Sequence, residues 1–421
     1  MAVTNWSGSV TYGAARTHRP RSVDELRRIV AGARRVRALG SRHSFSLVAD
    51  TVDDLVRLDG LPPEVEVGEG RSTATVSAGM RYAEVAADLH RRGLALANMA
   101  SLPHISVAGS CATGTHGSGD GQRSLSASVV ALQLVGPDGD LLELRRDTDP
   151  GTFPGAVVAL GALGIVTRLT LRVEPAFEVA QQVRVNVPLD EIASRFGEVF
   201  GAAYSVSAFT DWRSGEANVW LKRRTDRPEH DGGAERRVWN GGRPASEPLH
   251  PVPGMPPAAC TVQMGVPGPW HERLPHFRPE FTPSAGEELQ SEWLLPRETA
   301  PEVIAAIRDL GDLVAPVLHI SEIRTVRADD LWLSPAQGRD SVAFHFTWIR
   351  DPDGVLPVVA ELDARLLPLG ARPHWGKLTT AAPSEIVAAY GHAPDFARLM
   401  RTLDPEGKFR NAYVDGLFPP A

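Results

Sequence analysis

The sequence is poor in the residues that would build a disulfide scaffold or a structural metal site. It has two cysteines, Cys111 and Cys260, which show no metal-binding spacing and no disulfide framework. His43, His104 and His116 lack the i, i+4 spacing with a carboxylate that zinc hydrolases use. We therefore expect a protein of a reducing compartment that holds no metal.

Basic blocks and long apolar runs are also missing. The formal net charge is −7 without a basic block, which argues against nucleic acid or an anionic membrane as a partner. The longest apolar run, Ala156–Val166, is too short to span a bilayer and contains two glycines. The first residues show neither the basic nor the apolar region of a signal peptide. We expect a monomeric, cytoplasmic protein.

What is present is the composition of an ordinary globular protein, 43% hydrophobic and 23% charged over 421 residues, without internal repeats. This length suggests two or three domains. Helices and strands mix irregularly before Pro175, the expected first domain boundary, which indicates an α+β unit. The elements expected there are helices after Ser22 and from Tyr82 to Gly93, a helical segment at Ala156–Gly161, and strands at Val36–Leu39, Asp53–Leu58, Thr73–Ser77, Val129–Val135, Leu141–Leu144 and from Gly164.

The second half of the chain becomes regular after a long irregular stretch. Residues 225–288 are rich in proline, glycine and charge, so loops and short strands are expected there. The order strand, helix, strand, strand, helix then fits an antiparallel sheet with helices on one face. The corresponding segments are Leu289–Leu295, Ala300–Leu313, Leu318–Val326, Ser341–Ile349 and Val355–Leu367.

The most informative stretch is Asn98–Gly119, in which nearly every residue after Ser106 is small. Small residues let a backbone approach a ligand closely, and successive N–H groups with hydroxyl side chains form an anion cradle. Gly40–Phe45, after a predicted strand, has the same chemistry. The stretch is neither a Walker loop nor a Gly-x-Gly-x-x-Gly turn. A pyrophosphate seat is favoured over a flexible linker because linkers rarely carry residues such as Ile105 and Val107.

Two predicted strands and one loop could carry a polar site. Glu322 and Arg324 leave the same face of their strand, where they hold hydroxyl groups or form a solvated surface pair. His345 and Thr347 lie opposite an aromatic face, so His345 enters the same cleft or is structural. Lys377 ends a Pro-His-Trp-Gly-Lys segment, and a lysine held beside an arginine or an apolar wall can act as a base.

Several segments together resemble one flavoprotein family. Gly40–Phe45, Asn98–Ser110 and Gly161–Val166 resemble the FAD domain of the vanillyl-alcohol-oxidase family. Leu403–Tyr413 is similar to the C-terminal signature of its aldonolactone-oxidoreductase branch. Within this branch the chain most resembles the bacterial alditol oxidases, over nearly its whole length and including the segment Gly265–Arg278.

The resemblance implies an α+β, two-domain vanillyl-alcohol-oxidase/PCMH-type FAD-binding fold. Residues 1–175 would form the FAD-binding domain, 176–372 an α+β cap domain that binds substrate, and 373–421 a segment returning to the FAD domain. FAD would be attached covalently through His43. The residues implied to bind FAD are Gly40, Ser41, Arg42, His43, Ser44, Ser101, Ser106, Gly109, Ser110, Cys111, Ala112, Ile165, Val166, Thr347 and His374.

The implied activity is that of an oxidase using FAD: oxidation of the C1 hydroxyl of alditols such as xylitol or sorbitol to the aldose, with O2 reduced to hydrogen peroxide. The partners would be a small polyol and O2, and the base would be Lys377 or His345. Two alternatives stay open, a sugar-1,4-lactone oxidase or dehydrogenase of the same fold and a flavin-binding protein without turnover. The implied catalytic residues are Lys377, Arg324, Glu322 and His345, and the implied substrate contacts are Ser101, Gln290, Glu322, Arg324 and Lys377.

Two positions bear on how closely the family pattern applies. Arg42 stands where glycine is usual in the family, and if that position needs a positive φ, arginine costs about 1 kcal/mol or more of strain. Ala100, beside Ser101, is small enough to leave O2 an open path to the flavin. We therefore expect oxidase behaviour.

Overall fold

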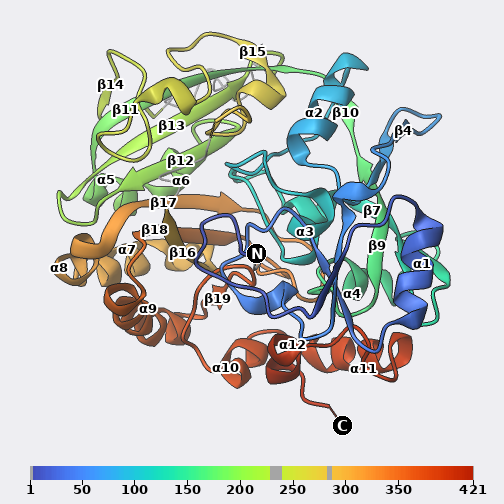
Figure 1. Ribbon diagram of the computed structural model, residues 1–421. Helices are drawn as coiled ribbons and strands as arrows, with labels where there is room; N and C mark the ends of the chain where they lie inside the picture. The colour runs from blue at the N-terminus through green and yellow to red at the C-terminus, as the bar shows by residue number, and fades with distance from the viewer. Residues whose placement is uncertain (1–2, 228–238, 282–286, 421) are drawn as a thin grey trace.

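The computed structural model describes residues 3–227, 239–281 and 287–420, and three larger sheets organise them (Figure 1). A three-stranded sheet has the order β1-β3-β2, and a five-stranded sheet has the order β4-β5-β9-β7-β8. A nine-stranded sheet follows the path β14-β11-β13-β12-β17-β18-β16-β19, with β15 paired to β11 beside this path. The two smaller sheets use the first part of the chain, and the largest uses the remainder.

The helices and strands of the first part form largely as the sequence predicts. Helix α1 (Val23–Gly32) begins after Ser22, whose side chain accepts a hydrogen bond from the backbone N–H of Glu25. Helix α2 (Tyr82–Arg91) is followed by Gly93 with φ +71°, a conformation that favours glycine. The strands are β1 (Arg16–His18), β2 (Val36–Leu39), β3 (Asp54–Arg57), β4 (Val65–Val67), β5 (Thr73–Ser77), β7 (Val129–Val135), β8 (Leu141–Arg145) and β9 (Ile165–Arg172).

Two helix predictions are wrong. The helical segment expected at Ala156–Gly161 is instead α4 (Phe153–Val157), and the chain then turns through Leu160 and Gly161, both at positive φ. The helix expected at Ala300–Leu313 is divided into α7 (Ala300–Arg308) and α8 (Gly311–Val314). A Cβ on Gly311, the first residue of α8, would lie 2.7 Å from the carbonyl oxygen of Trp212, a close tertiary approach that periodicity does not reveal.

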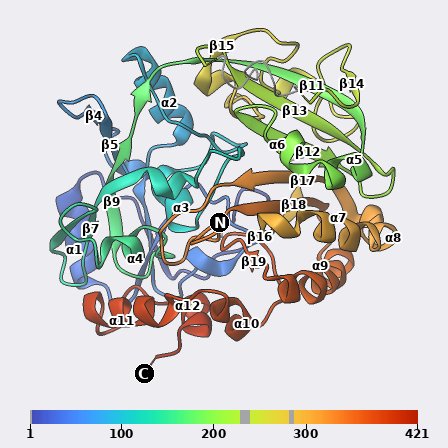
Figure 2. The same ribbon diagram turned by 180° about the vertical axis from the view of Figure 1, so that it is seen from behind.

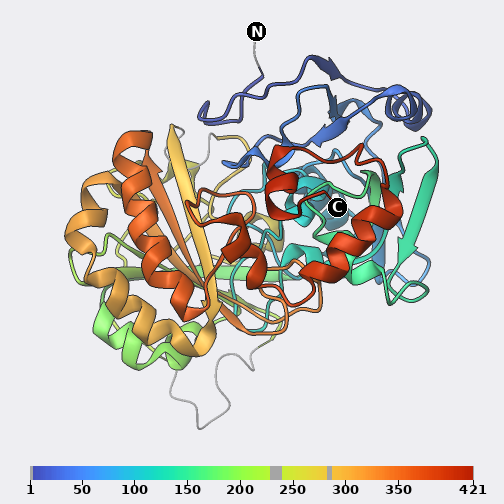
Figure 3. The same cartoon turned by 90° about the horizontal axis from the view of Figure 1, so that it is seen from below.

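Helices cover one face of the nine-stranded sheet, as predicted (Figure 3). Alternate residues of a strand share one side, so Trp293, Phe344, Phe346 and Trp348 form a layer on the covered face. All four are fully buried beneath the helices. The strands are β11 (Glu178–Pro188), β12 (Ser205–Thr210), β13 (Glu216–Arg224), β14 (Arg243–Pro244), β15 (Gly268–Pro269), β16 (Glu288–Pro296), β17 (Leu318–Val326), β18 (Ser341–Ile349) and β19 (Arg372–Pro373). The covering helices are α5 (Leu189–Ser194), α6 (Phe196–Phe200), α7 and α9 (Pro352–Leu366).

The C-terminal helices pack against the first part of the chain. In the back view, α10 (Pro383–Ala388), α11 (Ala393–Leu403) and α12 (Ala412–Leu417) run along the bottom of the molecule (Figure 2). Phe396 and Val414 share one hydrophobic core with Leu26 and Val85. The domain boundaries at residues 175 and 372 stay a prediction. Across the described ranges, no helix is long and apolar enough to cross a membrane.

Candidate active site

A cavity of about 270 Å³ is lined by residues from all three larger sheets. Arg37 on β2, Val166 on β9 and Glu322 on β17 all reach it. The structure therefore brings both implied binding sites to one place. The predicted site residues that line the cavity are Gly40, Ser41, Arg42, His43, Ser44, Ser101, Ser106, Gly109, Ser110, Ala112, Val166, Gln290, Glu322, Arg324, His345, Thr347, His374 and Lys377.

Two of the predicted cofactor residues have side chains elsewhere. Ile165 is buried in the core beside β7. Cys111 lies in the same core with its Sγ atom 3.7 Å from the hydroxyl oxygen of Tyr82, and burial raises the pKa of its thiol to about 12. Cys111 is therefore a small buried core residue rather than a wall of the cavity.

The two glycine-rich segments hold each other by a reciprocal pair of serines. The backbone N–H of Ser106 donates to Ser41 Oγ at 2.8 Å, and the backbone N–H of Ser41 donates to Ser106 Oγ at 3.3 Å. A Cβ on Gly40 or Gly109 would lie 2.3 or 2.7 Å from Ser106 Oγ, so only glycine allows this approach. The short helix α3 (Val107–Ala112) follows directly. Small residues and hydroxyls thus form a wall that fits the diphosphate of FAD.

His43 lies at the cavity in a form that can act as a nucleophile. Its Nδ1 is 3.0 Å from Ser41 Oγ. Burial, together with nearby His104 and Lys377, lowers the pKa of His43 to about 3, so the ring is neutral at physiological pH. The preceding residue, Arg42, has φ 65°, the left-handed conformation considered from the sequence.

The three histidines considered for a metal site do not converge. The rings of His43 and His104 are 6.5 Å apart, whereas His116 lies with its Nε2 3.2 Å from Glu292 Oε1. Among the described parts of the chain, no three histidine, cysteine or carboxylate side chains form a group that could hold a metal ion.

A row of ionisable residues crosses the face of the nine-stranded sheet that the helices do not cover. His345 on β18 pairs in register with Glu322 on β17 and with Glu292 on β16. Because alternate residues of a strand share a face, this row lies opposite the buried aromatic layer. Burial opposes ionisation of Glu322, but Arg324 and His276 outweigh it and hold its pKa well below the usual range. Burial and Lys377 lower the pKa of His345 to about 3, so the imidazole is neutral.

Arg324 connects this row to the glycine-rich segment. Its guanidinium donates to Glu292, lies 3.6 Å from Glu322 Oε2, and donates to Ser101 Oγ at 3.4 Å. Arg324 Nε is buried without a hydrogen-bond partner. A buried donor beside a carboxylate is suited to a hydroxyl group of a ligand, since leaving the donor unpaired is costly.

Lys377 lies in a loop that crosses between the sheet and the glycine-rich segments. Its ammonium group donates to Gln290, and its nitrogen is 5.3 Å from the centre of the Phe45 ring. The backbone N–H of Phe45 donates to Gly376, and that of Leu378 donates to Gln290. Burial lowers the pKa of Lys377 to about 8, so it exchanges a proton near neutral pH.

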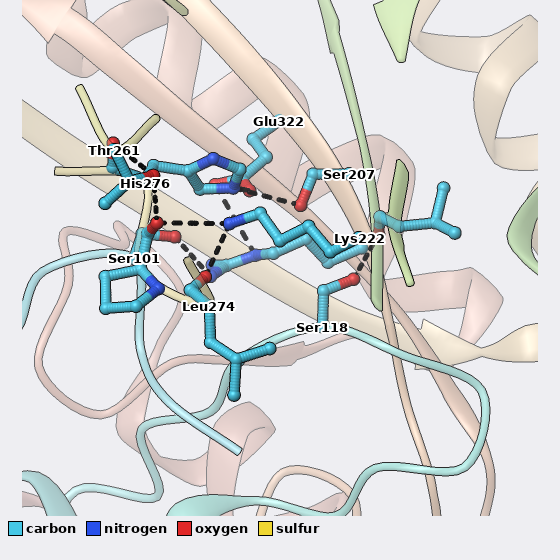
Figure 4. Close-up of polar contacts among 12 residues, drawn as sticks. Ser101, Ser118, Ser207, Lys222, Thr261, Leu274, His276 and Glu322 are labelled. Atoms are coloured by element: carbon cyan, nitrogen blue, oxygen red, sulfur yellow. Dashed lines mark hydrogen bonds and ion pairs between the residues drawn. The ribbon is translucent and has the colours of Figure 1, made fainter. Parts of the chain in front are cut away.

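A second layer of buried polar groups supports Glu322 (Figure 4). His276 Nε2 is 3.1 Å from Glu322 Oε1 and 3.2 Å from Ser207 Oγ, and the backbone N–H of His276 donates to the carbonyl of Ser101. The Lys222 ammonium donates to the carbonyl groups of Leu274 and Pro275, so it anchors the segment that carries His276. Burial lowers the pKa of Lys222 to about 7 and that of His276 to about 4.

Sequence reasoning missed Glu292, His276 and Trp6, all of which line the cavity. Glu292 had a usable signal, because it follows Gln290 by two positions on a predicted strand and so shares its face. His276 lies in an irregular stretch, and Trp6 near the N-terminus, where no periodicity points to a site.

Comparisons with known proteins agree with this geometry. A family model described as an FAD binding domain matches residues 14–145, and one described as D-arabinono-1,4-lactone oxidase matches residues 287–417. An alditol oxidase from Streptomyces sp. (strain IKD472 / FERM P-14339) is 51% identical over 420 residues, or 99% of each chain. An L-gulono-1,4-lactone dehydrogenase from Mycobacterium tuberculosis is 27% identical over 99% of each chain.

Solved structures share the fold at low sequence identity. The crystal structure of cholesterol oxidase from B. sterolicum superposes with a TM-score of 0.79 and 14% identity, covering 99% of this chain and 96% of that one. The α+β FAD-binding fold expected from the sequence is thereby confirmed. Because the chain is 51% identical to an alditol oxidase over nearly its whole length, it belongs to the alditol oxidase family of FAD-binding flavoproteins.

Proposed function

We propose that this protein is an FAD-dependent oxidase that converts the C1 hydroxyl of acyclic polyols, such as xylitol and sorbitol, to the aldose. The observation that carries the proposal is the row of His345 and the two buried carboxylates Glu322 and Glu292, which faces the same cavity as the serine- and glycine-rich loops. Bound FAD supplies the hydride acceptor and passes the electrons to O2, giving hydrogen peroxide.

The polar groups of the cavity match a chain of hydroxyls. Glu322, held ionised, offers acceptors, while Arg324, Ser101 and Lys377 offer donors. A substrate hydroxyl beside Arg324 Nε would accept a hydrogen bond from this buried donor, which lies 3.6 Å from Glu322 Oε2 and makes no hydrogen bond in the structure. A polyol that lacks this hydroxyl leaves the donor unpaired, so deoxy analogues bind poorly.

Two groups are suited to handle the proton of the C1 hydroxyl. His345 is neutral and can accept a proton, and Lys377, with a pKa of about 8, can accept one or stabilise the developing alkoxide as a cation. Both lie close to Gln290 Oε1, His345 Nε2 at 3.3 Å and Lys377 as its hydrogen-bond donor. This shared contact holds the two groups in one part of the cavity.

The proposal is tested by anaerobic single-turnover reduction of the flavin by xylitol. Lys377→Met removes the titratable group but keeps an apolar side chain of similar length, and we expect reduction to slow about a hundredfold or more. Flavin content and the thermal midpoint serve as controls for folding. Reduction at the parent rate would remove Lys377 from the mechanism.

Covalent attachment of FAD through His43 is part of the proposal. A neutral imidazole at the cavity, with Ser41 on one ring nitrogen, is suited to form such a bond. Flavin should then remain on the protein after acid precipitation, and His43→Ala should release it. Flavin that stays bound to the His43→Ala variant in acid would contradict this linkage.

Reaction with O2 is favoured by the small side chain of Ala100, which lines the cavity next to Ser101. We propose that it leaves O2 a path to the reduced cofactor. If the protein and its Ala100→Gly variant both reacted with O2 no faster than free flavin, the oxidase assignment would fail. A monomeric state and a cytoplasmic location remain expectations from the sequence.

A lactone oxidase or dehydrogenase is the second candidate, because a D-arabinono-1,4-lactone oxidase model matches residues 287–417. A flavin-binding protein without turnover is disfavoured, since such a protein needs no second buried polar row at the cavity. Higher activity on lactones than on polyols would favour the lactone enzyme. Bound flavin that no polyol bleaches under anaerobic conditions would favour the binding protein without turnover.

A further inference from the structure

Residues 3–12 form a tight hairpin beside the loop that carries His43. Thr4 and Thr11 form an antiparallel bridge, and the backbone N–H of Asn5 donates to Val10 at 2.9 Å. The side-chain Oδ1 of Asn5 accepts from the N–H of Val10.

The hairpin holds the His43 loop by its backbone on both sides. The N–H of Trp6 donates to the carbonyl of Arg42 at 2.9 Å, and Asn5 Nδ2 donates to the carbonyl of Ser44 at 3.1 Å. These two carbonyls flank His43 directly. With Arg42 in a left-handed conformation, the loop needs such external bonds to keep one geometry.

The Trp6 side chain contacts the imidazole itself. Its ring stacks on His43 with centroids 5.6 Å apart and an interplanar angle of 26°, and it meets Phe45 edge-on at 6.4 Å. Trp6 also lines the cavity, and its indole Nε1 is buried without a hydrogen-bond partner. Because it combines a free donor with a place in the cavity wall, this N–H is available to a bound molecule.

The hairpin is anchored on its far side to the nine-stranded sheet. Arg350, just after β18, donates to the carbonyl of Gly8 at 2.9 Å. Gly8 has φ +69°, and a Cβ there would lie 3.0 Å from the Arg350 guanidinium, so glycine permits this close contact. The hairpin therefore bridges the His43 loop and the strand that carries His345 and Thr347.

We propose that Trp6 is a positioning residue for covalent flavin attachment: it fixes the plane of the His43 ring against the cavity and forms part of the flavin wall. This inference rests on the proposed His43 linkage. Forming that bond replaces one C–H bond of the flavin 8α-methyl group and one imidazole N–H by a C–N bond. Two protons leave, and the flavin takes up two electrons, which O2 removes as hydrogen peroxide.

The test follows the flavin that resists acid precipitation, over time, after FAD is added to flavin-free full-length protein. Trp6→Ala should bind FAD, measured as total flavin before acid, but attach it about tenfold more slowly or worse. Trp6→Phe keeps an aromatic ring for stacking and should recover most of the rate. Trp332→Ala is the matched control, because Trp332 stacks on His392 away from the cavity.

Attachment by Trp6→Ala at the parent rate overturns the proposal. An equal loss of total and acid-resistant flavin in both Trp6 variants also overturns the proposal. That result would mean that Trp6 is needed for the fold or for FAD binding and not for attachment. The parent protein and His43→Ala are run alongside. If the parent has no acid-resistant flavin, or if His43→Ala keeps it, the proposed His43 linkage is wrong and the inference about Trp6 fails with it. If the parent has acid-resistant flavin and His43→Ala lacks it, a negative result for the Trp6 variants contradicts only the role of Trp6.

Discussion

At the scale of single residues, burial of Lys377 in the site lowers the free energy of unfolding. Lys377 has an ordinary pKa of 10.5, which burial lowers to about 8. Below pH 8 both the folded and the unfolded chain carry the proton, and the folded state bears the full penalty of a buried charge. Between pH 8 and 10.5 the unfolded chain binds more protons, so this penalty disappears as the pH rises.

Replacing Lys377 by methionine should therefore stabilise the protein while it removes activity. A shift from 10.5 to about 8 corresponds to about 3 kcal/mol as an upper estimate at pH 7, and the gain should shrink towards pH 10. Urea unfolding of both proteins at the two pH values measures the difference. A less stable variant at pH 7, or a gain that does not change with pH, would contradict the assigned environment of Lys377.

The second residue-scale prediction concerns Arg42, which has φ 65°. Glycine adopts this conformation without strain, so Arg42→Gly should be more stable than Arg42→Ala by about 1 kcal/mol. Arg28, which is exposed within α1, provides the matched control. There Arg28→Gly should be less stable than Arg28→Ala by about 1 kcal/mol, because glycine is unfavourable within a helix. Equal stability of the two Arg42 variants would show that the loop relaxes.

At the scale of elements, the central strands and the loop after Lys377 are tied together by one carboxylate. Asp363 on α9 is buried and accepts from Trp293 Nε1 on β16 at 2.8 Å. It also accepts from the backbone N–H groups of Thr380 and Ala381 at 2.7 and 3.1 Å. One side chain thus fixes a helix, a strand and the loop that carries the proposed catalytic lysine.

Asp363→Ala should lower the free energy of unfolding by about 3 kcal/mol, because it leaves an indole N–H and two backbone N–H groups unpaired. Glu361→Ala on the same helix is the control, since Glu361 makes only an exposed pair with Arg365 and should change stability by about 0.5 kcal/mol or less. Denaturant unfolding gives both values. Similar values for the two variants would mean that the loop is held by other contacts.

The elements also show which parts of the structure can be predicted from sequence. Strands β17 and β18 are predicted to the residue because alternation is a local pattern. The close approach of Gly311, the first residue of α8, to the carbonyl of Trp212 is not predictable in this way, because the two residues are about a hundred positions apart in the chain. Alternation also places Glu322 and Arg324 on one face, whereas the strand register that puts Glu292 beside His345 depends on tertiary pairing.

At the scale of the whole molecule, the cavity lies where separate parts of the chain meet. The hydrophobic core of the first and last segments contains Phe153 and Phe396, whereas the core of the nine-stranded sheet contains Trp293 and Phe346. The loops suited to FAD come from the first part, where the FAD binding domain model also matches, and the row of Glu322, His345 and Glu292 comes from the second. Reaction therefore requires both parts to be in place.

The most direct measurement is the rate of peroxide release by the flavin-loaded protein with xylitol, sorbitol, L-gulono-1,4-lactone and D-arabinono-1,4-lactone, paired with anaerobic bleaching of the flavin by each compound. We expect both polyols to bleach the flavin and to release one peroxide per aldose formed, about tenfold or more faster than either lactone. A faster reaction with a lactone, or a flavin that no polyol bleaches, would contradict it.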